Sequence, residues 1–149
     1  MSPSPAEVEP LPDEWLVVID PQAIFASPAS AWGSPFFGDV MPRIRSLAEA
    51  FGERVIVTRW MPTADRSTSW GEYFAAWPFA DQAPSDPLFD LVPEAIGLSP
   101  LPTLDLPTFG KWGTEIEKFV AALTSRRSSP LARNQPSTKI GRNPFCRGS

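Results

Sequence analysis

The chain has 149 residues with a formal net charge of −4, and 42% of its residues are hydrophobic, which suits one compact domain with an apolar core and gives no indication of nucleic-acid binding. No apolar run approaches the roughly 18 residues of a membrane span, and the N-terminus lacks the basic and apolar regions of a signal peptide. Histidine is absent, which excludes His-based acid–base catalysis and His metal sites.

The first 19 residues comprise a lead-in and a predicted strand. Residues 1–14 are rich in proline and acidic residues, which is typical of a flexible segment. Residues 15–19 form a continuous apolar run, which is followed by Asp20 and Pro21. Such runs, rich in β-branched residues, are typical of a strand buried on both faces of a parallel sheet. Pro21 ends the strand because it has no N–H to donate.

A helix and a second strand are predicted next. The helix begins near Asp39 as N-cap, with Pro42 in its first turn, and Gly52 is a suitable C-terminal stop. Residues 54–58 repeat the pattern of a buried strand. Strand, helix and strand in this order predict a right-handed βαβ unit.

The remainder of the body is predicted to be loop, strand and helix. Residues 61–100 contain many prolines and aromatic residues and are interpreted as a long loop, which in compact domains is uncommon unless it is functional. A short third strand is expected at residues 103–106, and a helix opens at residues 113–115 and continues to Leu123.

The composition changes after Leu123. Residues 124–149 contain six basic residues and no acidic ones, whereas all 17 acidic residues lie earlier in the chain. This charge reversal and the lost apolar periodicity predict a disordered basic tail. The folded domain is therefore predicted to span residues 15–123, and the tail is hypothesised to come from a shifted reading frame or an unrelated end.

Two charged residues follow predicted strands, where ligands bind in open α/β sheets. Asp20 could orient a substrate or act as a base, or it could simply cap a turn. Lys111 lies between two aromatic residues and two glycines, where it could stabilise a thiolate or an oxyanion. The alternative for Lys111 is a surface lysine stacked on Trp112.

The remaining candidates are a thiol and two aromatic residues. Cys146 is the only cysteine, so no internal disulfide is possible, which fits a reducing compartment and indicates a cytoplasmic protein. In a disordered tail it would be an ordinary exposed thiol, although Arg147 beside it favours the thiolate slightly. Trp77 and Phe25 could cover a planar apolar substrate or could belong to the core.

Taken together, four segments resemble the isochorismatase-like cysteine hydrolase family, which includes nicotinamidases. In chain order the matching residues are Val17-Val18-Ile19-Asp20-Pro21-Gln22 with Phe25 downstream, Val55-Ile56-Val57-Thr58-Arg59-Trp60, Glu72-Tyr73-Phe74-Ala75-Ala76-Trp77-Pro78-Phe79, and Thr108-Phe109-Gly110-Lys111-Trp112-Gly113-Thr114. Their order and spacing match over residues 14–123.

The resemblance implies a fold and a chemistry. The fold is a three-layer α/β/α domain around a parallel sheet. The chemistry is hydrolysis of a small amide or related substrate by an Asp-Lys-Cys triad, in which Asp20 takes the thiol proton and Lys111 favours the thiolate. By the same resemblance, Phe25 and Trp77 flank the substrate ring, and a homo-oligomer is compatible because relatives often self-associate.

The sequence departs from the family in two places. The metal-binding histidines of nicotinamidases are absent, and Trp60 stands where some relatives have one, so no metal is expected. The family's cysteine follows an apolar strand in a pattern like Gly-Val-x-Thr-x-x-Cys, whereas no such strand precedes Cys146. The fold is therefore expected to be incomplete at the C-terminus and the hydrolase to be impaired.

The functional expectation is thus a cysteine hydrolase with impaired chemistry. Alternatives are an active enzyme in which Cys146 reaches the pocket, and a non-catalytic fragment or interaction protein whose basic tail contacts an acidic partner. A haloacid-dehalogenase-like phosphatase is discounted, because it needs a second Asp where Gln22 stands. A small-molecule substrate is expected, with no cofactor, membrane or nucleic-acid partner; the absence of a Gly-rich phosphate loop argues against a dinucleotide.

Overall fold

The computed structural model describes residues 8–127. The chain divides into two compact units, residues 1–111 and residues 112–149, and each is described by itself. The first unit contains a sheet, three helices and several single turns of 3₁₀ helix. The second contains one helix within its described part.

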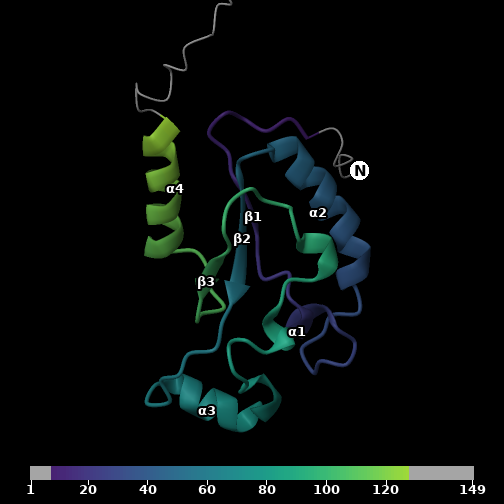
Figure 1. Ribbon diagram of the computed structural model, residues 1–149, viewed down its shortest axis with the longest axis vertical. Coiled ribbons are helices and arrows are strands. Elements are labelled where there is room, and N and C mark those ends of the chain that lie inside the picture. Colours follow the sequence, from purple (N-terminus) through teal and green to yellow (C-terminus); the bar gives the residue numbers. More distant parts are fainter. Residues whose placement is uncertain (1–7, 128–149) are drawn as a thin grey trace, which may run out of the picture. The chain divides into compact units, whose positions relative to one another are not determined.

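A three-stranded parallel sheet forms the centre of the first unit (Figure 1). Its strands are β1 (Leu16–Val18), β2 (Val55–Trp60) and β3 (Leu104–Leu106), in the order β1-β2-β3. Val18 is level with Val57 on β2, and Thr58 is level with Leu104 on β3. The predicted α/β class with a parallel sheet is confirmed, and so are the three strands.

The central strand β2 is buried on both faces, as its continuous apolar sequence predicts. Val55 and Val57 belong to an apolar cluster together with Val18 of β1. Ile56 and Thr58, which point to the opposite face because side chains alternate along a strand, are equally buried. The sheet therefore has no solvent-facing side at β2.

Helix α2 (Phe37–Phe51) connects β1 to β2 and lies alongside them (Figure 1). It ends at Gly52, whose φ of 61° is the left-handed conformation that glycine adopts without strain, as predicted. The predicted start was wrong, because the N-cap is Phe36, and Asp39 lies inside the first turn. Pro42 lies within the helix, near its N-terminal end.

The segment interpreted as a long loop contains a helix. Helix α3 (Ser69–Ala76) begins after Thr68, whose hydroxyl accepts a hydrogen bond from the Trp70 N–H, and it buries Phe74. Three 3₁₀ turns follow, η2 (Pro78–Ala80), η3 (Pro87–Phe89) and η4 (Pro93–Ala95), each opened by a proline. A further short helix, α1 (Ala23–Ala26), follows β1.

Two apolar clusters make up the core of the first unit. One lies between the sheet, α2 and η4, and its buried members are Val18, Met41, Ala48, Val55, Val57, Val92, Ala95 and Leu98. The other lies at the end of β2 and contains Ile24, Trp60, Phe74, Ala80 and Phe89. The second cluster surrounds the carboxyl end of the sheet, where the candidate site is expected.

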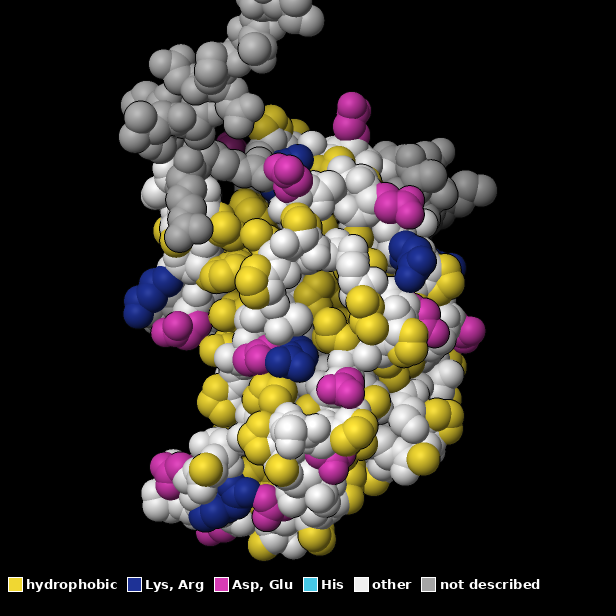
Figure 2. Space-filling model, viewed as in Figure 1, with side chains coloured by type: hydrophobic (Ala, Val, Ile, Leu, Met, Phe, Trp, Pro, Cys, Tyr) yellow, Lys and Arg dark blue, Asp and Glu magenta, His cyan; other side chains and the backbone are white. Residues whose placement is uncertain are grey.

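Hydrophobic side chains also reach the surface, as the face in Figure 2 shows. Large exposed examples in the first unit are Leu11, Ile19, Phe36 and Ile96. Scattered exposed apolar residues are common on folded proteins, so none of these identifies a binding site by itself.

Helix α4 (Thr114–Arg127) belongs to the second unit. It opens where predicted and continues four residues beyond Leu123, the position at which the composition changes. The predicted disordered tail lies, from residue 128 onward, outside the described residues, and so does Cys146. None of the helices found within residues 8–127 combines the length and apolarity needed to cross a membrane.

Candidate active site

Asp20 lies two residues beyond β1, at the carboxyl end of the sheet. Its backbone is left-handed, with φ of 50°, a conformation that aspartate tolerates better than most residues. Its N–H donates to the Thr58 hydroxyl oxygen at 3.1 Å, and the same hydroxyl donates to Oδ1 of Asp20 at 2.7 Å. Thr58 on the neighbouring strand therefore fixes both the backbone and the carboxylate of Asp20.

Lys111 follows β3, and its side chain turns inward and is only 1% exposed. Its Nζ lies 3.3 Å from Oδ2 of Asp20. The ammonium also donates to the carbonyl of Thr108 and, at 3.5 Å, to that of Leu106. The structure thus brings together two of the three predicted catalytic residues, and Lys111 is not a surface lysine stacked on Trp112.

Burial shifts the proton equilibria of this pair in opposite directions. Burial raises the pKa of Asp20 above its ordinary value, although the hydrogen bond from Thr58 and the charge of Lys111 oppose the shift. Burial lowers the pKa of Lys111, and the charge of Asp20 opposes that shift. Asp20 therefore binds a proton more readily, and Lys111 releases one more readily, than the same groups would when exposed to solvent. Shifted pKa values of this kind are common at catalytic sites.

A pocket of about 370 Å³ opens beside Asp20. Its lining residues are Ile19, Asp20, Phe25, Trp32, Ser34, Phe37 and Phe109. The volume suits a small molecule, and the walls are mainly apolar and aromatic. Asp20 is therefore the charged residue in the lining of a mainly apolar and aromatic pocket.

The two aromatic residues predicted to flank a substrate differ in their positions. Phe25 lines the pocket and stacks on Trp32 with ring centroids 6.2 Å apart. Trp77 is not among the lining residues, and it contacts Trp32 edge-on at 5.8 Å. Its contact with a substrate stays a prediction, whereas Trp32 and Phe109 contribute pocket wall that the sequence analysis did not assign.

Trp60 lies at the centre of the aromatic cluster behind this pocket. Phe109 stacks on it with ring centroids 5.4 Å apart, and Trp32 meets it edge-on at 5.7 Å. The Trp60 side chain is fully buried, and its indole N–H is a buried polar group without a hydrogen-bond partner in the described part of the chain. Trp60 is thus part of an aromatic core.

Gln22 connects the three segments around the site, a role that the sequence did not reveal. Its amide N–H₂ donates to the carbonyls of Trp60 at 2.9 Å and Phe89 at 2.8 Å, and its Oε1 accepts from the Trp60 N–H at 2.7 Å. The side chain is fully buried. The only sequence signal for this role of Gln22 was its place, as a long polar residue, directly after the strand and Pro21.

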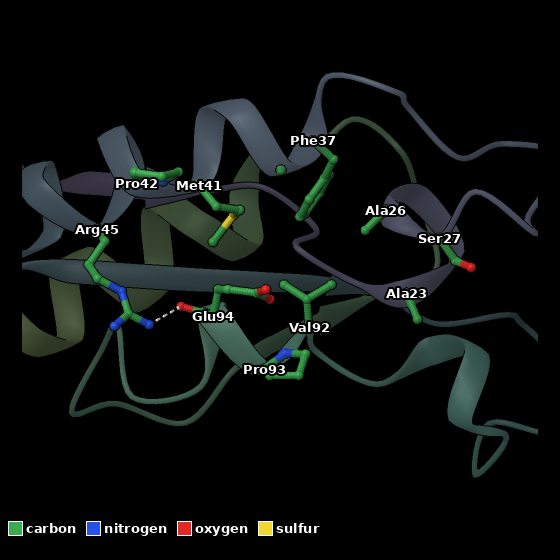
Figure 3. A pocket seen from close by; sticks show the side chains of 11 residues that line it. Ala23, Ala26, Ser27, Phe37, Met41, Pro42, Arg45, Val92, Pro93 and Glu94 are labelled. Atoms are coloured by element: carbon green, nitrogen blue, oxygen red, sulfur yellow. Dashed lines mark hydrogen bonds between the residues drawn. The ribbon is translucent and has the colours of Figure 1, made fainter.

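A larger pocket, of about 530 Å³, lies away from the Asp20–Lys111 pair. Figure 3 shows it between α1, α2 and the segment containing η4, with Phe37, Met41 and Val92 among its walls. At one end, Arg45 donates to the carbonyl of Glu94 at 2.9 Å. Neither Asp20 nor Lys111 lines this larger pocket, whereas Asp20 lines the smaller one.

The third predicted catalytic residue, Cys146, cannot be placed, because it lies outside the described residues. Among the residues that are described, no group of three or more acidic, histidine or cysteine residues is arranged to hold a metal ion.

A solved structure shares this arrangement of elements. The chain is similar to a cysteine hydrolase from Pseudomonas syringae pv. phaseolicola 1448A, with a TM-score of 0.57 and 22% sequence identity. The two proteins have the same fold. The match covers 82% of this chain and 60% of the other, so this chain spans less than two thirds of that hydrolase. No protein-family model and no curated protein matches the sequence.

Proposed function

We propose that the chain carries the Asp–Lys part of a cysteine hydrolase site of the isochorismatase-like family, directed at a small amide or related substrate. In this proposal Asp20 and Lys111 are two members of the triad, and Cys146, as the only thiol, is the third. Hydrolysis is impaired in this proposal because the sequence before Cys146 lacks the apolar strand pattern that precedes the nucleophile in such enzymes.

The observation that carries the proposal is the buried contact between Lys111 and Asp20, the latter of which lines an aromatic pocket. A buried ion pair is seldom retained for stability alone, since its desolvation cost often exceeds the attraction between the charges. Here it lies at the carboxyl end of a parallel sheet, the usual position of ligand sites in open α/β folds. The shared fold with a cysteine hydrolase supports the same interpretation.

The chemistry would follow the two steps of covalent amide hydrolysis. Asp20 accepts the thiol proton, and the thiolate attacks the amide carbonyl while the Lys111 ammonium stabilises the developing negative charge. The amine leaves with the proton from Asp20. A water molecule then gives a proton to Asp20 and attacks the thioester, which releases the acid and regenerates the thiol.

The rate at which Cys146 is alkylated, measured against pH, tests whether the triad is assembled. A free cysteine has a pKa of about 8.5. For an impaired site, the native and the denatured chain are expected to show the same profile near that value. A native profile displaced to lower pH, and restored by Lys111→Met, would show an assembled triad and refute the impairment.

Hydrolysis of a panel of small aromatic and aliphatic amides tests the chemistry itself. We expect turnover to be weak or absent in the unmodified chain and unchanged in Cys146→Ser. Turnover that disappears in both Cys146→Ser and Asp20→Asn would establish an active hydrolase instead. Lys118→Met, which changes an exposed lysine of α4, is the matched control for Lys111→Met.

The charge distribution supports a second candidate, a non-catalytic interaction protein. Six basic residues after residue 123 follow a body that contains all 17 acidic residues. Such a segment would bind an acidic partner in a salt-dependent manner. Binding to an acidic polymer such as polyglutamate that weakens with salt and disappears on deletion of residues 128–149 would favour this candidate.

A further inference from the structure

Thr58 makes two hydrogen bonds to one residue, and both go to Asp20. Its hydroxyl oxygen accepts from the Asp20 N–H at 3.1 Å, and its single hydroxyl proton is donated to Oδ1 of Asp20 at 2.7 Å. Thr58 is fully buried on β2, between the strand that precedes Asp20 and the strand that precedes Lys111. The accepted bond fixes the direction in which the hydroxyl proton can point.

The two oxygens of the Asp20 carboxylate are therefore not equivalent. Oδ1 accepts the Thr58 hydroxyl, whereas Oδ2 lies 3.3 Å from Nζ of Lys111. A carboxyl oxygen that carries a proton is a poorer acceptor, so protonation of Oδ1 would weaken the bond from Thr58. Protonation of Oδ2 leaves that bond intact and weakens only the contact with Lys111, whose ammonium has further acceptors in the carbonyls of Thr108 and Leu106.

We infer that Thr58 is a positioning residue for Asp20, whose hydroxyl holds Oδ1 and so makes Oδ2 the oxygen that takes up and returns the proton. The inference rests on the proposed function for the identity of the proton donor, a thiol or a water molecule. The assignment of Oδ2 as the oxygen that is protonated rests on the geometry of the hydrogen bonds alone. The residue acts through Asp20 and touches no substrate in this scheme.

The left-handed backbone of Asp20 makes such positioning necessary. With φ of 50° the residue adopts a conformation that most L-residues avoid. The hydrogen bond from the Asp20 N–H to Thr58 stabilises this backbone, and the hydrogen bond from the Thr58 hydroxyl to Oδ1 sets the side-chain rotamer of Asp20. A single hydroxyl thereby directs the carboxylate towards Lys111.

The inference can be tested by substituting Thr58 and following the titration of Asp20 by NMR of its carboxyl carbon. Thr58→Val preserves the shape of a buried β-branched residue but removes the hydroxyl. Because the hydrogen bond from Thr58 lowers the pKa of Asp20, the Val variant should titrate Asp20 at higher pH, and Thr58→Ser should restore the original midpoint. An unchanged midpoint in Thr58→Val would overturn the inference.

Thr103 provides a matched control, because its hydroxyl donates to Oδ1 of Asp105 at 2.9 Å on the exposed part of β3. Burial raises the pKa of Asp105, but the hydrogen bonds from Arg59 and Thr103, together with the charges of Arg59 and Lys111, lower it overall. Thr103→Val should therefore raise the midpoint of Asp105 and leave that of Asp20 unchanged. A shift of Asp20 in this variant would show that the effect of Thr58→Val is not specific.

A measurement on the unmodified chain keeps the inference testable if Thr58→Val does not fold. The Thr58 hydroxyl proton should exchange slowly with solvent above and below the midpoint of Asp20, since protonation of Oδ2 preserves its bond. Loss of protection on protonation would place the proton on Oδ1 and overturn the assignment. Neither readout depends on turnover, so the inference and the proposed hydrolysis can fail separately.

Discussion

The Nζ atom of Lys111 lies 3.3 Å from Oδ2 of Asp20, and the contact spans the width of the described sheet. Asp20 follows β1 and Lys111 follows β3, the two outer strands, while Thr58 on the central strand β2 binds the same carboxylate. The pair therefore exists only when all three strands are paired in register.

Removing one partner of the pair should be costly. Lys111→Met leaves a buried carboxylate without its cation, and we expect the free energy of unfolding near pH 7 to fall by about 3 kcal/mol. Asp20→Asn should cost less, because the raised pKa of Asp20 means that burial already disfavours its charged form, and the double variant should recover much of the loss caused by Lys111→Met. Urea unfolding of the four proteins measures this cycle.

Lys118→Met is the control for that cycle, because Lys118 is exposed and its ion pair with Glu115 lies 3.7 Å apart on the surface of α4. Its effect should stay within about 0.5 kcal/mol. A double variant that is as unstable as the sum of the two single variants would contradict the coupling between Asp20 and Lys111.

The acid pH dependence of stability should carry a contribution from Asp20 with a definite sign. Its pKa is raised in the folded chain above the ordinary value of 3.8, so the folded state binds this proton more tightly than the unfolded state. As pH rises from 3.8 through the raised value, the contribution of Asp20 to the free energy of unfolding must fall.

The unfolding free energy of the unmodified chain relative to Asp20→Asn isolates that contribution. We expect the difference to decline with rising pH across this window and then to level off. Asp65 and Asp105, whose pKa values are lowered, give slopes of the opposite sign, but they are present in both proteins and cancel. A difference that increases with pH would show that the pKa of Asp20 is lowered instead.

Salt should distinguish the buried pair from the exposed pair on the same sheet. Arg59 donates two hydrogen bonds to Asp105, at 2.9 and 2.6 Å, and the two side chains are 26% and 38% exposed. Their coupling energy should be about 1 kcal/mol or less at low ionic strength and should decrease as salt is added.

The coupling between Asp20 and Lys111 should change little over the same range, because solvent ions do not reach it. Double-mutant cycles with Arg59→Met and Asp105→Asn, and with Lys111→Met and Asp20→Asn, compare the two pairs in dilute buffer and in 1 M salt, where the screening length is about 3 Å. Equal salt sensitivity of both pairs would indicate that the buried pair is open to water.

Loss of the Gln22 side chain should destabilise the site as a whole. Gln22→Leu keeps a side chain of similar size but replaces the amide with an apolar group, which leaves the Trp60 N–H and the two carbonyls without their partners. An unsatisfied buried polar group costs about 1–3 kcal/mol, so a loss of at least about 2 kcal/mol is expected in urea unfolding.

Gln82 offers the control for this substitution, because its amide donates to the Phe79 carbonyl at 3.3 Å in an exposed position. Gln82→Leu should change the free energy of unfolding by less than about 0.5 kcal/mol. If both variants were equally stable, the hydrogen bonds of Gln22 would not contribute to the fold.

The sequence predicted the parts of the structure that depend on local pattern. The apolar runs that became β1 and β2, the helix between them and its glycine stop all reflect period and capping within short windows. Asp20 could be selected because it directly follows a predicted strand, and Lys111 because it lies between a predicted strand and a predicted helix. These features need no knowledge of which distant residues meet.

The features that were missed depend on contacts between distant segments. Gln22 bonds to residues 38 and 67 positions away, and Thr58 looked like an ordinary member of a buried strand. Trp32 lies between the first predicted strand and the predicted helix, where no role was assigned to it, yet its ring contacts those of Phe25, Trp60 and Phe109. Helix α3 was missed because a threonine cap and the burial of Phe74, not a clear apolar period, define it.

The hydrogen bonds of Gln22 end on main-chain atoms of Trp60 and Phe89, not on their side chains. The frame that places Asp20 is therefore indifferent to which rings surround it. Ligand preference could drift, or be diversified in a library at Phe25, Trp32 and Phe109, without displacing the acid–lysine pair. In this chain the residues that would transfer protons and the residues that would select a ligand can therefore be substituted independently.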